Sequence, residues 1–148
     1  MGTWAIIGYA MMINSFVFQN PLFECNGERV TEVVACQNME RCVIINDYTA
    51  VAYAHLYCER ELLREWIQTS AFIGMCIAPF LITLTANKIG RKRAYFLNLL
   101  LGLWGIISLL VGIYFSNAIL MILGLFFLGT MVSGFNTLTY ICSTEYFN

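Results

Sequence analysis

Long runs of apolar residues alternate with short polar segments along most of this chain. From Trp66 to Thr144 the only charged residues are one cluster, Lys88, Arg91, Lys92 and Arg93. A helix needs about 20 apolar residues to cross the roughly 30 Å hydrocarbon core of a bilayer, and backbone groups in lipid must pair within the spanning segment. The pattern therefore predicts an all-α membrane protein embedded in a lipid bilayer, with four transmembrane helices at about residues 3–18, 66–86, 95–114 and 119–141.

The first span, residues 3–18, is the shortest and allows a second interpretation. Secretory signal peptides also have short apolar cores. However, no basic residue opens this run, and Asn20 and Pro21 follow it where a cleavage site would have small residues. We therefore expect a retained helix. The 148 residues would then form a single transmembrane region, which we expect to be a fragment or truncated form of a longer protein.

Charge is distributed unequally between the polar segments that separate the spans. The segment at 87–94 has four Lys or Arg residues and no acid, whereas the segment at 19–65 has four Arg residues and eight acids. Because basic residues concentrate in cytoplasmic loops, we expect residues 87–94 inside and residues 19–65 outside, with both termini cytoplasmic. The net charge of −1 gives no reason to expect a nucleic-acid partner.

Four of the six cysteines, Cys25, Cys36, Cys42 and Cys58, lie in the long outer loop between the first two spans. In an oxidising compartment four cysteines predict two disulfides, for which three pairings are open. A zinc site is the alternative, but the spacings contain no C-x-x-C and His55 is the only histidine. We therefore expect disulfides and no metal, in the plasma membrane or another membrane of the secretory pathway.

The predicted spans contain no Asp, Glu, Lys, Arg or His. Intramembrane charges usually mark ion or proton pathways, so a charge that binds an ionic solute would have to come from elsewhere. Polar side chains in the spans either line a cavity or, more commonly, bond between helices, while the glycines of the last two spans predict close helix packing. The polar candidates are Asn14, Gln68, Asn98, Ser133, Asn136, Thr137 and Tyr140, the last four of which share one helical stripe.

The basic cluster carries a pattern that is similar to the signature between helices two and three of the major facilitator superfamily, G-x-x-x-D-R-x-G-R-R/K. The residues that match directly are Gly90, Arg91 and Lys92. Thr83 stands where the family has its first glycine, and Asn87 stands where it has the acid. Losing the acid at Asn87 removes one partner of the family's ion pair.

Three further segments resemble the organic-ion transporter branch of that superfamily. Residues 21–25 are similar to the opening of its long cysteine-rich outer loop, residues 56–59 to the end of that loop, and residues 144–147 to the segment after helix four. The family's R-x-x-x-G in helix four has Leu125 in the arginine position and keeps Gly129. The resemblance covers essentially the whole chain but only four of the family's twelve helices, so it implies a partial major facilitator bundle.

The resemblance implies transport of a small organic ion by alternating access, with no bound cofactor and with further transmembrane helices to complete the pathway. It also implies a conformational latch at the cytoplasmic surface. The residues of this latch would be Asn87, Gly90, Arg91, Lys92, Arg93 and Glu145. Arg91 and Arg93 offer forked donors to a carboxylate, and Gly90 permits a positive φ where two helices reverse. The alternative is a basic loop that only sets topology.

A structural or interaction protein of claudin-like topology is the second candidate. Such proteins also place both termini inside and a large disulfide-bearing first loop outside. A genuine stop codon after Asn148, together with strand-rich structure in residues 19–65, would favour this class. Their loop is rich in tryptophan, whereas Trp66 at its boundary is the only tryptophan near this one. An enzyme is not expected, because the sequence has no G-x-S-x-G, H-E-x-x-H, P-loop or Rossmann glycine pattern.

Overall fold

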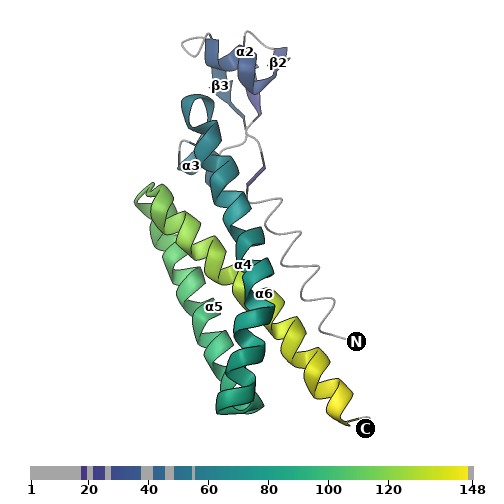
Figure 1. The fold of residues 1–148 in the computed structure, drawn as a ribbon. Helices are drawn as coiled ribbons and strands as arrows, with labels where there is room; N and C mark the ends of the chain where they lie inside the picture. The colour runs from purple at the N-terminus through teal and green to yellow at the C-terminus, as the bar shows by residue number, and fades with distance from the viewer. Residues whose placement is uncertain are drawn as a thin grey trace.

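The computed structural model describes residues 18–19, 22–25, 28–37, 42–45, 49–54 and 56–146. The first predicted span, residues 3–18, lies almost wholly outside this part of the chain, and so does Asn14. The described helices and strands (Figure 1) are β1 Phe23–Cys25, β2 Glu28–Val30, α2 Glu32–Gln37, β3 Cys42–Ile44, α3 Ala50–Tyr53, η2 Cys58–Arg60, α4 Glu61–Ile89, α5 Arg91–Tyr114 and α6 Ala118–Tyr146.

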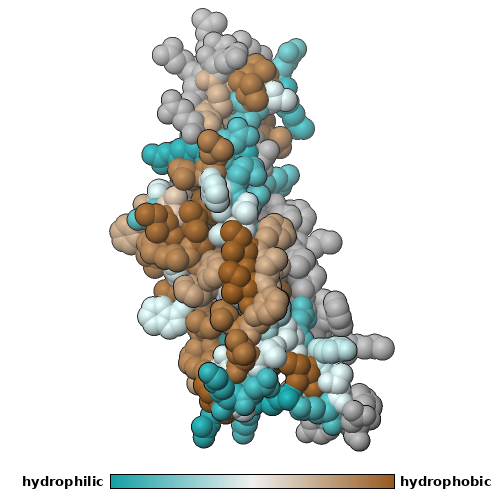
Figure 2. All heavy atoms as spheres, viewed as in Figure 1, coloured by the Kyte–Doolittle hydropathy of each residue, from teal (hydrophilic) through white to brown (hydrophobic). Residues whose placement is uncertain are grey.

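Three of these helices, α4, α5 and α6, are long and apolar enough to cross a membrane. They correspond to the second, third and fourth predicted spans and indicate a membrane protein. Phe80, Trp104 and Leu110 are each more than 60% exposed on them, and contiguous apolar surface of this kind marks contact with a membrane or a partner. Figure 2 shows the apolar residues over the middle of the visible face, with polar residues along its lower edge and again above.

The helices extend beyond the predicted spans into the polar segments. α4 begins at Glu61 rather than residue 66, because Glu, Leu and Arg are good helix formers and an acid suits the first turn of a helix. The predicted loop at residues 87–94 is wrong, since only Gly90 separates α4 from α5. The 29 residues of α4 rise about 43 Å, which is longer than the roughly 30 Å hydrocarbon core that a hydropathy pattern detects.

Two short turns reverse the chain between the long helices. Gly90 has φ 91° and ψ 152°, a region that is open almost only to glycine, so the predicted positive φ is confirmed. Its N–H donates to the carbonyl of Ala86 at 3.1 Å, and its own carbonyl accepts from the N–H of Ala94 at 3.1 Å. At the other turn Asn117 Oδ1 accepts from the N–H of Ile119 at 3.1 Å and so caps α6.

Small residues allow α6 to pack closely against both α4 and α5. A Cβ added at Gly74 on α4 would overlap the carbonyl oxygen of Phe126, and one added at Gly129 on α6 would overlap that of Ala71. The backbones of α4 and α6 therefore touch, which confirms the close packing predicted from the glycines. The glycines of α5 that lie against α6 are Gly102, Gly105 and Gly112.

Residues 19–65, here called the disulfide segment, contain a three-stranded antiparallel sheet in the order β2-β1-β3. The prediction of an all-α chain is therefore wrong in this segment. Phe23 pairs with Val30 on one side and Ile44 on the other, and such side chains favour strands. Strands of three residues are too short to show the alternation by which a strand is recognised in sequence. Figure 1 shows the sheet beyond the start of α4, at the end opposite the α4–α5 turn.

The disulfide segment is not a free loop, because a buried apolar cluster joins it to the long helices. Thr49 Oγ1 accepts from the N–H of Ala52 at 3.3 Å and caps α3, which places Val51 in this cluster. The residues of the cluster are Phe18, Val51, Ala54 and Leu56 from the disulfide segment and its approach, Ile67 and Ala71 from α4, and Met121 and Leu125 from α6.

Candidate functional site

An ion pair joins the first residue of α5 to the end of α6. Arg91 Nη2 donates to Glu145 Oε1, although 54 positions separate these residues in sequence. They meet because the short turn at Asn117 makes α5 and α6 antiparallel. The two side chains are 33% and 56% exposed, and exposed pairs of this kind contribute only about 0–1 kcal/mol. The contact can therefore open and close at little cost.

A cavity of about 470 Å³ adjoins this pair. The residues that line this cavity, here called the turn-end cavity, are Arg91, Lys92, Tyr95, Leu138, Cys142 and Glu145. Tyr95 is held against α6 by the ring of Phe135, with centroids 5.0 Å apart. Arg91 Nη1 is buried and has no hydrogen-bond partner among the described residues. The cavity thus combines two cationic side chains, one acid and an apolar wall.

Three of the six residues predicted as a latch, Arg91, Lys92 and Glu145, meet at this cavity. Gly90 forms the turn beside it. Asn87 and Arg93 are exposed, and neither is among the residues that line the cavity. The role of the set as a latch stays a prediction.

Tyr95, Leu138 and Cys142 also line the cavity, although they were not predicted from the sequence. The available signal was helical spacing, because Tyr95 lies one turn after Arg91 and Cys142 lies one turn before Glu145. Side chains three or four residues apart share a helix face. Once Arg91 and Glu145 are taken as partners, their neighbours on the same faces are the side chains that complete the cavity.

Two of the polar residues predicted in the spans form hydrogen bonds between elements. Asn98 is 1% exposed, and its Nδ2 donates to the carbonyl of Met131 on α6 at 3.0 Å. Gln68 Nε2 donates to the carbonyl of Phe18 at 3.4 Å. These contacts fit the more common of the two predicted roles, in which polar side chains connect packed segments.

The polar stripe of α6 is only partly sheltered. Ser133, Asn136 and Thr137 are half-buried, and Tyr140 is 71% exposed. The Thr137 hydroxyl donates to the carbonyl of Ser133 at 3.0 Å within the helix. None of these residues lines the turn-end cavity, so their predicted contact with a solute stays a prediction, as it does for Asn14 outside the described residues.

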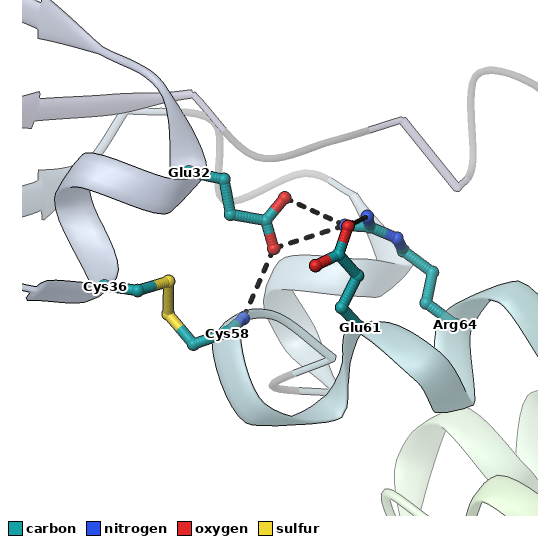
Figure 3. Close-up of a disulfide and its surroundings, with 5 residues drawn as sticks. All are labelled: Glu32, Cys36, Cys58, Glu61 and Arg64. Carbon is teal, nitrogen blue, oxygen red and sulfur yellow. Dashed lines mark hydrogen bonds and ion pairs between the residues drawn. A yellow bond between two sulfur atoms is a disulfide. The ribbon is translucent and has the colours of Figure 1, made fainter.

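A second charged cluster lies where α4 begins (Figure 3). Arg64 is only 3% exposed, and its Nη1 donates to both carboxylate oxygens of Glu32 at 3.1 and 3.3 Å, while Nη2 donates to Glu61 at 3.5 Å. Glu32 Oε1 also accepts from the N–H of Cys58 at 3.3 Å. Because Cys58 is bonded to Cys36 of α2, a disulfide and a buried ion pair together fasten α2 to the start of α4.

This pair was not predicted, because in the sequence Arg64 is one of twelve charged residues of an outer loop. The signal was present in the spacing of α4. Arg64 continues the buried stripe of Ile67, Ala71 and Gly74 by one turn, and residues at these intervals share a helix face. A charged residue on a buried stripe must be paired, which predicts a partner in the disulfide segment.

The two predicted disulfides are confirmed, with one of the three open pairings. Cys25 is bonded to Cys42 across paired positions of β1 and β3, and Cys36 is bonded to Cys58. These bonds exclude a zinc site made of the same four sulfurs. Among the described residues no group of three or more His, Cys, Asp or Glu residues could hold a metal ion.

Comparisons with models of known protein families, with curated proteins and with solved structures found no match. The two charged clusters and the sequence pattern of the α4–α5 turn are therefore the features that bear on function. These clusters lie at opposite ends of α4, and they differ in burial. Arg64 is 3% exposed, whereas Arg91 is 33% exposed.

Proposed function

We propose that this chain is part of a transporter that moves small organic ions across a membrane by alternating access. The Arg91–Glu145 pair carries the proposal. It connects the α4–α5 turn to the end of α6, and it arises from the turn whose Gly90, Arg91 and Lys92 are similar to the major facilitator signature. In that family a contact of this kind stabilises the outward-facing state and breaks during transport.

The physical properties of the two ends support such a cycle. Transport by alternating access needs a contact that breaks in every turnover, and the exposed Arg91–Glu145 pair contributes only about 0–1 kcal/mol. The opposite end of α4 is held by the buried Arg64–Glu32 pair and the Cys36–Cys58 disulfide. This arrangement favours a rocking motion at the α4–α5 turn, in which the disulfide segment moves together with α4.

The proposal includes further transmembrane helices and a defined orientation. Between Trp66 and Thr144 the sequence has charges only at the α4–α5 turn, so the charge that binds an organic ion comes from other helices. The large exposed apolar side chains of α4, α5 and α6 provide surface for both lipid and such helices. The basic turn is cytoplasmic, and the disulfide segment lies outside.

Uptake measurements test this function. In liposomes that contain the 148-residue chain alone, uptake of tetraethylammonium and of aminohippurate will equal that of empty liposomes. In cells that express the chain and supply other membrane proteins, uptake of one of these two probes will exceed that of mock-transfected cells. Uptake by the chain alone would contradict the requirement for further helices, and no increase in cells for either probe would contradict transport.

Charge reversals connect that uptake to the ion pair. Arg91→Glu or Glu145→Arg alone will lower uptake several-fold, and the double reversal will restore part of it. Arg93→Glu is the matched control, because Arg93 belongs to the same basic cluster but does not line the turn-end cavity. Amounts of each variant in the plasma membrane are matched by isolating that membrane and detecting the chain by immunoblot. Equal effects of Arg91→Glu and Arg93→Glu would mean that only the net charge of the turn matters.

A structural or interaction protein of claudin-like topology is the second candidate, and the disulfide-bonded sheet in residues 19–65 favours it. This class predicts increased electrical resistance across an epithelial layer that expresses the chain, with no change in uptake of either probe. The transcript gives an independent discriminator. Eight further apolar spans encoded after Asn148 would support transport, and a stop codon there in every transcript would support the structural class.

A further inference from the structure

The turn-end cavity has a polar side and an apolar side. Arg91 and Lys92 provide two positive charges, partly balanced by Glu145, and Leu138 and Cys142 form an apolar wall. The cavity lies where the apolar helices end, next to a turn with four basic residues. A ligand that fits both sides is an amphiphile with an anionic group, placed at the surface of a membrane.

The guanidinium of Arg91 has donors that the protein does not use. Nη2 donates to Glu145, whereas Nη1 is buried and has no hydrogen-bond partner among the described residues. A buried donor without a partner is unfavourable, and a rotation of the guanidinium toward a phosphate oxygen in the cavity would satisfy it. Arginine binds phosphate through two parallel N–H groups, and lysine adds a point charge. Lys92 is exposed beside Arg91, so both can act on one anion.

We propose that the turn-end cavity binds the phosphate group of an anionic phospholipid, with the start of an acyl chain against Leu138 and Cys142. The start of α5 adds the positive end of its dipole to the two side chains. Clusters of four or more basic residues at the end of a transmembrane helix attract anionic lipids, and the cavity gives such attraction a defined position. This site binds lipid whether or not the chain transports a solute.

Glu145 competes with the phosphate, because both acceptors use the guanidinium of Arg91. Removing the carboxylate therefore frees a donor and also removes a negative charge from the cavity wall. The site predicts that a neutral residue at position 145 tightens lipid binding. Damage to the fold would have the opposite effect, so the sign of this change separates a binding role from a structural one.

The test is titration of the purified 148-residue chain in neutral detergent micelles with dioctanoyl phosphatidic acid, followed by native mass spectrometry. Dioctanoyl phosphatidylcholine reports on binding of lipid without net charge, and glycerol 3-phosphate reports on a soluble phosphate ester. The variants are Lys92→Gln, Glu145→Gln and the matched control Arg93→Gln, which removes the same charge from outside the cavity. Circular dichroism establishes that all variants have equal helicity.

Phosphatidic acid will bind the chain at least about 10-fold more tightly than phosphatidylcholine or glycerol 3-phosphate. Lys92→Gln will weaken binding of phosphatidic acid by about 10-fold, as expected for loss of a charged hydrogen bond. Arg93→Gln will weaken it by less than about 3-fold, and Glu145→Gln will tighten it. Equal losses for Lys92→Gln and Arg93→Gln, or weaker binding by Glu145→Gln, would overturn the site. Equal affinity for glycerol 3-phosphate would overturn its assignment to a lipid.

Discussion

A methyl group added at Gly129 is expected to push α4 and α6 apart. The Cβ of Gly129→Ala would overlap the carbonyl oxygen of Ala71 and would also lie 2.9 Å from the carbonyl carbon of that residue. These are backbone atoms of a hydrogen-bonded helix and cannot move alone, so the whole helix has to shift. Gly102→Ala is the matched control, because the nearest atoms there are Sδ and Cγ of the Met131 side chain, and methionine changes rotamer easily.

The expected magnitudes follow from two opposing effects. Overpacking a close contact costs about 1–3 kcal/mol. Separating the helices also weakens the contact of the Ser70 hydroxyl with the carbonyl of Ile122 at 3.1 Å, which contributes less than about 1 kcal/mol because the same proton is shared with the carbonyl of Ile67 at 2.6 Å. Replacing glycine by alanine within a helix also stabilises that helix by up to about 1 kcal/mol. Gly129→Ala is therefore expected to lower the free energy of unfolding by about 1–3 kcal/mol. Gly102→Ala is expected to change it by less than about 1 kcal/mol.

Unfolding in mixed micelles measures this difference. Each purified variant is titrated with sodium dodecyl sulfate, and loss of helix is followed by circular dichroism together with tryptophan fluorescence. The midpoint for Gly129→Ala will fall clearly below that of the wild-type chain, while that for Gly102→Ala will stay close to it. If the two variants unfold at the same detergent fraction, the backbone contact between α4 and α6 does not determine stability, and the close packing at Gly129 is refuted.

Two further predictions concern the two ends of α4. Gly90→Ala will lower the free energy of unfolding by about 1–3 kcal/mol, because alanine must adopt φ 91° and ψ 152° there. The same titration measures this change. Nothing lies within 4 Å of the added Cβ, so the backbone conformation is the only source of the effect, and unchanged stability would contradict a fixed turn. Glu32→Gln will shorten the half-life of the Cys36–Cys58 disulfide under mild reductant, measured by alkylation and mass spectrometry, because it leaves the buried charge of Arg64 without its main partner. Glu61→Gln is the control and will have little effect, since Glu61 is 61% exposed and lies 3.5 Å from Arg64.

The three helices that are long and apolar enough to cross a membrane were predictable from the sequence because lipid imposes a strong and simple constraint. A run of about 20 apolar residues has few other stable states, and the structure has a long helix at each of the spans 66–86, 95–114 and 119–141. The same reasoning placed Arg91 and Glu145 at one end of the helices, where they form an ion pair. The four cysteines of two disulfides were also evident, because cysteines in an oxidising compartment pair.

The disulfide segment was less predictable because its structure depends on contacts between residues far apart in sequence. Nothing local decides that Cys25 pairs with Cys42 rather than Cys36, since strand pairing sets this choice through the register of β1 and β3. The helix bounds were wrong for a different reason. Hydropathy identifies the lipid-embedded residues, but helix propensity decides where the helix ends, and α4 begins at Glu61 with strong helix formers.

The two ends of α4 differ in how strongly they are held, and this difference connects the fold to the proposed transport cycle. At one end, removing a partner of a fully buried pair costs about 3–5 kcal/mol, which is an upper bound for Arg64–Glu32 because Glu32 is 14% exposed, and the nearby disulfide adds a covalent link. At the other end, an exposed pair such as Arg91–Glu145 contributes about 0–1 kcal/mol. Thermal energy opens only the second of these contacts often. We therefore expect the conformational change of the proposed transport cycle to begin at the α4–α5 turn, where the turn-end cavity holds the charges of Arg91, Lys92 and Glu145.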